Sequence, residues 1–257
     1  MGGIDVERDD RGVAMVWLDN PGHLNALSDA MILGLCEALP RLGDDASCRV
    51  IVLRGRGGVY CAGRELNDVK ALQGASRDAI ARIYGAMAAM NEAIYFSPVP
   101  VVSVVEKYAL GIATMLVAWS DLAIAEDGAM LGYPEVRHGI TPYGAIPTML
   151  NSMNRKAMLD LLLTGRRIDA AEALRLGLLT RVVPRERLDG ALDAIVDDIL
   201  SGSADAIRRS KAFVRECEAL GYREANALAA ERHVEGIGSP AMREGVAAFL
   251  DRKKNPA

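Results

Sequence analysis

Apolar and polar positions alternate near the start of the chain and later give way to longer apolar runs. Residues 12–20, GVAMVWLDN, alternate and stop at Asn-Pro-Gly, which predicts a strand that ends in a turn. Residues 48–55, CRVIVLRG, and 99–105, VPVVSVV, are short runs rich in β-branched residues. Such runs are typical of buried strands, so we expect three strands in the first 105 residues.

Helical spacing appears between these strands and after them. Ser28 is a candidate N-cap, and the apolar residues that follow it are spaced for one helix face: Met31, Leu35, Leu39 and Leu42. Residues 76–96 predict a helix rich in alanine and methionine. Residues 108–121, YALGIATMLVAWSD, begin with small residues and then become apolar, which predicts a tight glycine turn and a buried helix.

From about residue 154 the pattern predicts successive helices, the last of them over residues 239–254. Strands and helices alternate first, and helices alone finish the chain. This order indicates an α/β core with a helical C-terminal part. We expect a core over residues 1–195 and a helical region over residues 196–257.

Composition and charge exclude several classes of partner. The chain has 257 residues and a net charge of −4, with acidic and basic residues interspersed. It has no basic patch of the kind that binds nucleic acid. Its longest apolar run, residues 109–119, is about half a membrane span. The four cysteines show no metal-binding spacing with the histidines, and the polar N-terminus is not a secretory signal. We therefore expect a cytoplasmic protein that binds neither metal, membrane nor nucleic acid.

Two glycine-rich turns are candidates for a catalytic or binding site. GRGGVYCAGREL (residues 55–66) and YALGIAT (residues 108–114) each follow an apolar strand, and the second opens the predicted helix. Glycine lets backbone approach a ligand closely, and N–H groups at a helix N-terminus favour a developing anion. The two turns could aim two N–H donors at one oxygen, as in an oxyanion hole. They could also be simple tight connections. Neither contains the spacing of a dinucleotide fingerprint or a phosphate-binding loop.

Five motifs occur in an order and spacing that resemble the crotonase superfamily, the enoyl-CoA hydratase/isomerase family. They are NPGHLNALS, RVIVLRGRGGVYCAGREL, PVPVVSVVEKYALGIAT, SDLAIAEDGAMLGYPEVRHGI and LLLTGRRIDAAEALRLGLLTRVVP. The resemblance implies a ClpP/crotonase-like fold, a spiral of ββα units followed by a C-terminal helical region. It also implies assembly of that region into a homotrimer or homohexamer.

The resemblance further implies an acyl-CoA thioester as substrate, with coenzyme A as part of that substrate and no other cofactor. By position, the backbone N–H groups of Arg64 and Ile112 would form the oxyanion hole, in the turns that contain Gly63 and Gly111. The carbonyl of Ala62 matches the contact with the adenine of coenzyme A. In place of the Arg or Lys that often touches the coenzyme A phosphates, this chain has His23.

The chain departs from the family pattern at the catalytic pair. Hydratases of the family carry two glutamates, which match Met115 and Glu135 here. Methionine cannot move protons, so Glu135 is left as the single carboxylate. We interpret Met115 as core or as the floor of an acyl pocket. The usual triple glycine of the second turn is altered to Gly-Ile-Ala. The common Asp after the first turn is Glu65.

Three further side chains are candidate site residues, and the sequence leaves more than one role open for them. His138 could pair with a carboxylate or transfer a proton, or could be structural. Tyr143 matches the lining of the acyl pocket. The Arg64 side chain could reach a substrate carboxylate or could be solvated. In the predicted last helix, an apolar stripe at Met242, Val246, Phe249 and Leu250 suits a partner surface, and Lys253 and Lys254 could reach coenzyme A phosphates.

Several functions fit these residues. We favour an isomerase in which Glu135 takes a proton from one carbon of an enoyl-CoA and returns it to another. One alternative is an enoyl-CoA hydratase or hydratase-lyase with an altered catalytic pair. Other reactions through the same enolate, such as decarboxylation or thioester hydrolysis, form a third class. The last alternative is a non-catalytic paralogue that binds acyl-CoA or assembles with active partners.

Overall fold

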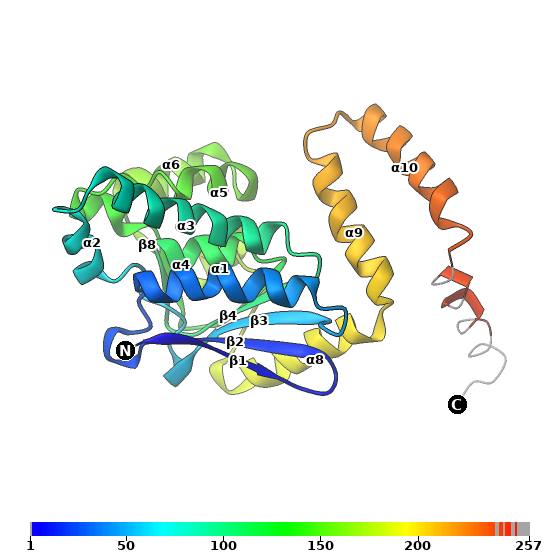
Figure 1. The fold of residues 1–257 in the computed structure, drawn as a ribbon, viewed down its shortest axis with the longest axis horizontal. Helices are drawn as coiled ribbons and strands as arrows, with labels where there is room; N and C mark the ends of the chain where they lie inside the picture. The colour runs from blue at the N-terminus through cyan, green and yellow to red at the C-terminus, as the bar shows by residue number, and fades with distance from the viewer. Residues whose placement is uncertain (1, 240–241, 244, 248–249, 251–257) are drawn as a thin grey trace. The chain divides into compact units, whose positions relative to one another are not determined.

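The computed structural model describes residues 2–239, 242–243, 245–247 and 250. The chain divides into two compact units, Met1–Asp197 and Asp198–Ala257. The first contains both β-sheets and the second is built from helices (Figure 1).

A six-stranded sheet forms the centre of the first unit, in the order β1-β2-β3-β4-β6-β9. The strands are β1 (Gly3–Arg8), β2 (Val13–Asp19), β3 (Val50–Gly55), β4 (Val101–Val105), β6 (Leu122–Glu126) and β9 (Arg181–Val183). β1 pairs antiparallel with β2, and every other neighbouring pair is parallel. The central strands β3 and β4 are buried along nearly their whole length, as expected for parallel strands covered on both faces.

A smaller sheet lies beside it and carries the second glycine turn. It consists of β5 (Tyr108–Leu110), β7 (Met130–Gly132) and β8 (Arg167–Asp169), in the order β5-β7-β8. β5 is separated from β4 by two residues only, so the chain passes from the large sheet to the small one without a helix. The end of β5 is therefore fixed by both sheets.

Helices cover the sheets of the first unit and complete its core. They are α1 (Asp29–Asp44), α2 (Leu66–Leu72), α3 (Arg77–Tyr95), α4 (Ile112–Trp119), α5 (Ala145–Ser152), α6 (Arg155–Thr164), α7 (Ala170–Arg175) and α8 (Leu188–Ser201). In Figure 1, α1 and α3 run across one face of the large sheet and α8 lies on the other. The core packs α4 among these layers, and six of its eight residues are buried.

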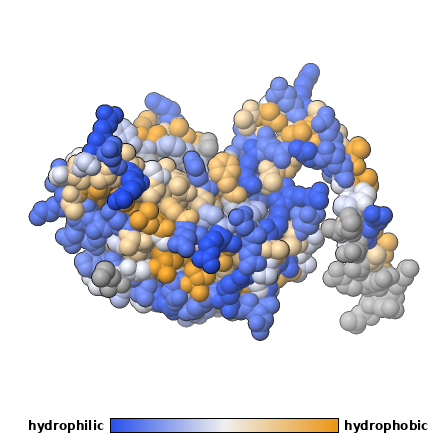
Figure 2. Space-filling view, viewed as in Figure 1, coloured by the Kyte–Doolittle hydropathy of each residue, from blue (hydrophilic) through white to orange (hydrophobic). Residues whose placement is uncertain are grey.

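The second unit contains α9 (Ala204–Cys217) and α10 (Tyr222–Gly236). Neither helix has a fully buried residue, and several large apolar side chains are exposed on them. Figure 2 shows these hydrophobic residues interspersed among hydrophilic ones. Across the described part of the chain, no helix is long and apolar enough to span a membrane.

The predicted elements agree with the structure where the sequence pattern is strong. β2, β3, β4 and the long helix α3 lie where the pattern placed them, and Ser28 caps α1 by accepting a hydrogen bond from the Met31 N–H at 3.2 Å. The expectation that helices alone finish the chain is wrong, because β8 and β9 interrupt them. These strands have three residues each, too few to show a period. β1 and α10 were not predicted.

Part of the predicted last helix lies outside the described residues. Phe249, Lys253 and Lys254 are among the residues not described. Met242, Val246 and Leu250 are described and are exposed. The role of residues 196–257 in assembly stays a prediction.

Candidate active site

Two buried asparagines hold the loop that supports the first glycine turn. The Asn20 N–H donates to Asn25 Oδ1 at 2.8 Å, and Asn25 Nδ2 donates to the carbonyl of Val59 at 2.6 Å. Asn25 and its neighbour Leu24 adopt the left-handed conformation, with φ of 56° and 51°. The strained loop is thereby fixed to residues 59–63. Leu24 completes the attachment, because its carbonyl accepts from the Ala62 N–H at 3.0 Å.

The second glycine turn is fixed by the end of the small sheet. Gly111 follows β5 with φ of 57° and ψ of −121°, and its N–H donates to the carbonyl of Gly132 on β7 at 2.8 Å. Its own carbonyl accepts from the N–H groups of Thr114 and Met115, which starts α4. A side chain at Gly111 would be strained at this φ and would displace the carboxylate of Glu135, since a Cβ there would lie 2.8 Å from Oε1.

Hydrogen bonds bring the two turns side by side. The Cys61 N–H donates to the carbonyl of Tyr108 at 2.9 Å, and the Leu110 N–H donates to the carbonyl of Cys61 at 3.3 Å. Gly63, with φ of 113°, packs so closely that a Cβ would lie 3.0 Å from the Leu110 carbonyl oxygen. The next residue after Gly63 is Arg64, and Ile112 is the second residue after Leu110.

The backbone N–H groups of Arg64 and Ile112 make no hydrogen bond within the described residues. Ile112 is the first residue of α4, where N–H groups have no intrahelical partner. Two unpaired donors therefore lie on neighbouring turns at the positions that the sequence predicted. Such donors stabilise an oxygen on which negative charge develops.

Glu135 lies next to the second turn, in a short 3-10 helix (Pro134–His138). Its Oε1 faces Gly111, and its Oε2 is buried without a hydrogen-bond partner. Burial raises the pKa of this carboxyl above the ordinary value of 4.5. Tyr133, two residues earlier, is fully buried, and burial together with the charge of Glu135 raises the pKa of its phenol. A carboxyl with a raised pKa is suited to both accepting and returning a proton.

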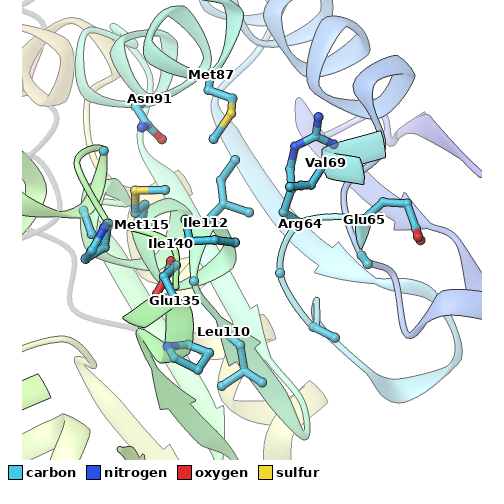
Figure 3. Close-up of a pocket in the computed structure, with 18 of the residues that line it drawn as sticks. Arg64, Glu65, Val69, Met87, Asn91, Leu110, Ile112, Met115, Glu135 and Ile140 are labelled. Carbon is cyan, nitrogen blue, oxygen red and sulfur yellow. The ribbon is translucent and has the colours of Figure 1, made fainter. Parts of the chain in front are cut away.

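One cavity of about 1190 Å³ is lined by ten of the site residues predicted from the sequence. Its lining includes Glu135, Arg64, Ile112, Ala62, Gly63, Gly111, Met115, His138, Tyr143 and His23. In Figure 3, Glu135 lies on one side of Ile112 and Arg64 on the other. Residues from four separate motifs therefore line the same cavity. The roles predicted for them stay predictions.

Met115 is both a core residue and a wall of the cavity. Its side chain is 4% exposed, and its sulfur lies close to Gly144, where a Cβ would be 3.5 Å from it. The interpretation of Met115 as a core residue is therefore confirmed, and its role as the floor of an acyl pocket stays a prediction. No carboxylate occupies this part of the wall, so the surroundings of Glu135 are apolar on that side.

Two polar side chains of the site, His23 and Arg64, already have partners. His23 Nδ1 lies 2.7 Å from Oε2 of Glu65, and the Glu65 side chain also caps α2 by accepting from the Asn67 N–H. The Arg64 guanidinium donates to the carbonyl of Leu27 at 2.8 Å and forms an ion pair with Asp29. The Arg64 side chain is therefore neither solvated nor free to reach a substrate carboxylate. It fixes the first turn to the start of α1.

His138 and Tyr143 lie at the open edge of the cavity. His138 is exposed, and Tyr143 is 76% exposed. Neither side chain makes a hydrogen bond to another described residue. Both side chains could contact a molecule bound in the cavity. The roles predicted for them from the sequence stay predictions.

The sequence missed the wall that α3 contributes. The α3 residues that line the cavity are Tyr84, Met87, Ala88, Asn91, Glu92 and Tyr95. Their spacing of three and four residues was a usable signal, because one helix face repeats in this way. The signal did not identify the cavity wall, because the opposite face of the helix has the same spacing. That face carries the buried residues Ile83, Met90 and Ile94.

A family model described as enoyl-CoA hydratase/isomerase matches residues 8–256. A probable enoyl-CoA hydratase, echA8, of Mycobacterium bovis is 32% identical over 97% of this chain and 95% of its own. Enoyl-CoA hydratase domain-containing protein 3 of Mus musculus is 30% identical over 96% and 82%. The crystal structure of an enoyl-CoA hydratase from Mycobacterium smegmatis superposes with a TM-score of 0.90 at 31% identity, covering 97% and 96%.

The raised pKa of Glu135 predicts a pH-dependent cost to folding. Between the ordinary value of 4.5 and the raised folded value, the folded protein binds more protons than the unfolded chain. The free energy of unfolding that this group contributes therefore falls as the pH rises through that window. Glu135→Gln removes the effect, so the variant should gain stability over the wild type as the pH rises from 4.5 through the raised pKa of Glu135. The gain is about 1.4 kcal/mol for each unit by which the pKa is raised.

Urea unfolding of both proteins across this pH range measures the difference. Glu37→Gln is the control, because Glu37 is an exposed glutamate on α1. A difference between wild type and Glu135→Gln that stays constant with pH would show that the carboxyl is not destabilised by burial.

Proposed function

The chain belongs to the enoyl-CoA hydratase/isomerase family, and on that premise we propose that it isomerises the double bond of an enoyl-CoA with Glu135 as its single proton-carrying carboxylate. Its fold is the expected crotonase spiral with a C-terminal helical region. An acyl-CoA enzyme is the function that the family supports. The choice of isomerisation is our own inference from the site.

One observation carries this choice. The Glu135 carboxylate has a buried, unpaired oxygen and lies against Gly111, the residue before the free N–H of Ile112, and the position of a second acid is occupied by Met115. Adding water across a double bond requires groups that hold and deprotonate that water. Moving a proton between two carbons of one substrate requires one base that can take and return it.

The proposed reaction begins with a 3-enoyl thioester in the cavity. The thioester oxygen accepts hydrogen bonds from the N–H groups of Arg64 and Ile112. Glu135 removes a proton from C2, and the electron pair moves into the thioester to give a dienolate whose oxygen is stabilised by the two donors. Glu135 then delivers the proton to C4, the double bond forms between C2 and C3, and the carboxylate is regenerated.

The apolar surroundings strengthen both parts of this cycle. Burial raises the pKa of Glu135 and so makes it a better proton acceptor than an exposed carboxylate. The same low polarity increases the attraction between the N–H donors and the enolate oxygen. Gly111 links the two effects, because it places the base against the first residue of the helix that carries one donor.

Coenzyme A enters only as part of the substrate in this proposal, with no metal or redox cofactor. The carbonyl of Ala62 would contact its adenine, while His23 and His138 lie at the more exposed part of the cavity lining. The pair between His23 and Glu65 places a negative charge beside the histidine, so His23 would bind a phosphate only weakly. We also propose a cytoplasmic location and a homotrimer or homohexamer assembled through residues 196–257.

Hydration is the second candidate, and the names of two similar proteins favour it. The Mycobacterium bovis and Mycobacterium smegmatis proteins are both named as enoyl-CoA hydratases. In this chain Glu135 would have to activate the water without a second carboxylate, helped by Tyr143, His138 or a backbone group. Tyr143 and His138 are exposed, which makes them poor at holding one water in place.

Glu135→Gln tests the role of the carboxylate directly. The substitution keeps the shape of the side chain and removes the base, so turnover of a 3-enoyl-CoA should fall by about 10²–10⁴. Steady-state kinetics with a matched melting temperature measure this. Turnover near the wild-type value in a folded variant would refute the single-carboxylate mechanism.

Ile112→Pro and Ile112→Ala together test the donor. Ile112 is 3% exposed, so both substitutions lose similar packing, but only proline removes the N–H. Proline is tolerated at the first helical position. Turnover of the proline variant should be about 10²–10³ lower than that of the alanine variant.

Melting temperatures of the two Ile112 variants establish that both are folded. Equal turnover in two folded variants would mean that the turn is only a connection and that Ile112 donates nothing to the substrate.

A further inference from the structure

Helix α3 lines the cavity with apolar and aromatic side chains and with two polar ones, Asn91 and the exposed Glu92. Of its cavity-lining residues, Asn91 is followed one helical turn later by Tyr95 and preceded by Met87 and Ala88. Across the cavity, α4 contributes Ile112, Met115 and Trp119, again on one face. The Tyr95 ring meets the Trp119 ring edge-on, with centroids 4.9 Å apart.

The Asn91 Oδ1 atom is buried and accepts no hydrogen bond from any described residue. More than nine in ten buried polar groups in native proteins have a partner, so each exception requires an explanation. No described side chain or backbone N–H is placed to satisfy this oxygen. Asn91 also has no role in the proposed proton transfer.

The position of Asn91 indicates what it would meet. In Figure 3 it lies beside Met87, and Met115 lies between it and Glu135. Met115 is three residues after Ile112, so about 4.5 Å of helix rise separates it from the N–H that would bind the thioester oxygen. Asn91 therefore faces the part of the cavity that an acyl chain would enter beyond its reacting carbons.

We propose that Asn91 recognises a hydroxyl group on the acyl chain of the substrate, beyond the carbons between which Glu135 moves the proton. The inference rests on the proposed acyl-CoA function and names its substrate class. A hydroxyl group in the cavity can accept from the amide Nδ2, and it can donate to Oδ1, which is otherwise buried, when the amide turns to face it. An unsubstituted chain does neither and leaves the buried oxygen unpaired.

The expected selectivity follows from this unpaired oxygen. Apolar pockets discriminate weakly between chains that differ by one small group, whereas a site built to bond a hydroxyl rejects the analogue that lacks it. We expect at least about a 10-fold preference for one hydroxylated chain, which corresponds to one hydrogen bond. The carbon that carries the hydroxyl is identified by the ester that is preferred.

Binding measurements test the proposal without turnover. In the Glu135→Gln background, calorimetry compares trans-2-heptenoyl-CoA with its 5-hydroxy, 6-hydroxy and 7-hydroxy derivatives. One hydroxylated ester should bind at least about 10-fold more tightly than the unsubstituted ester. Asn91→Leu, which has a similar size and no hydrogen-bonding group, should remove that preference. Met87→Leu is the matched control on the same helix face and should retain it.

Two results would overturn the proposal and leave the proposed function standing. The four esters could bind equally well to the Glu135→Gln protein, or the preference could survive in Asn91→Leu. Asn91→Ala provides the same comparison if the leucine variant is unfolded. A failure of all four esters to bind would overturn the acyl-CoA function and this inference together.

Discussion

The contact between the Glu135 carboxylate and the backbone of Gly111 is the constraint on which the site depends. A Cβ at Gly111 would lie 2.8 Å from Oε1, so only glycine allows the carboxylate to approach the turn. The same residue has φ of 57°, which glycine adopts without strain, and its carbonyl accepts the hydrogen bonds that begin α4. One glycine therefore sets the place of the base, the start of the helix and the direction of the Ile112 N–H.

The rest of the first unit holds this contact in place. β5 and β7 fix Gly111 from one side, and residues 59–63 pair with β5 from the other. Buried charges secure the same region, since Arg54 donates to Glu106 at 2.9 and 3.1 Å just before β5 begins. Such a pair contributes more to a defined geometry than to stability. The desolvation of the two buried charges offsets much of the free energy gained from their attraction. The site is thus built on rigid elements, with only its outer edge exposed.

The sequence predicted the backbone parts of the site better than its side-chain wall. Gly63 and Gly111 mark the turns because their positive φ angles are unfavourable for other residues, and the predicted residues of both turns line the same cavity as Glu135. The Arg64 side chain was misjudged, since its ion pair with Asp29 joins segments 35 residues apart. Asn91 was missed because the sequence pattern shows that the helix has two apolar faces. The pattern does not show which of the two faces borders a cavity. β8 and β9 were missed because pairing with distant strands, and not local propensity, creates them.

The central claim is that one carboxylate moves a proton between two carbons of the same substrate and adds no water. Mass spectrometry of the product from a 3-enoyl-CoA in water enriched in ¹⁸O tests it most directly. The account predicts a 2-enoyl-CoA of unchanged mass as the product, with no ¹⁸O incorporated into the acyl group. A 3-enoyl-CoA that stays unconverted, while a 2-enoyl-CoA in the same water gains one labelled water, would contradict the account and identify a hydratase.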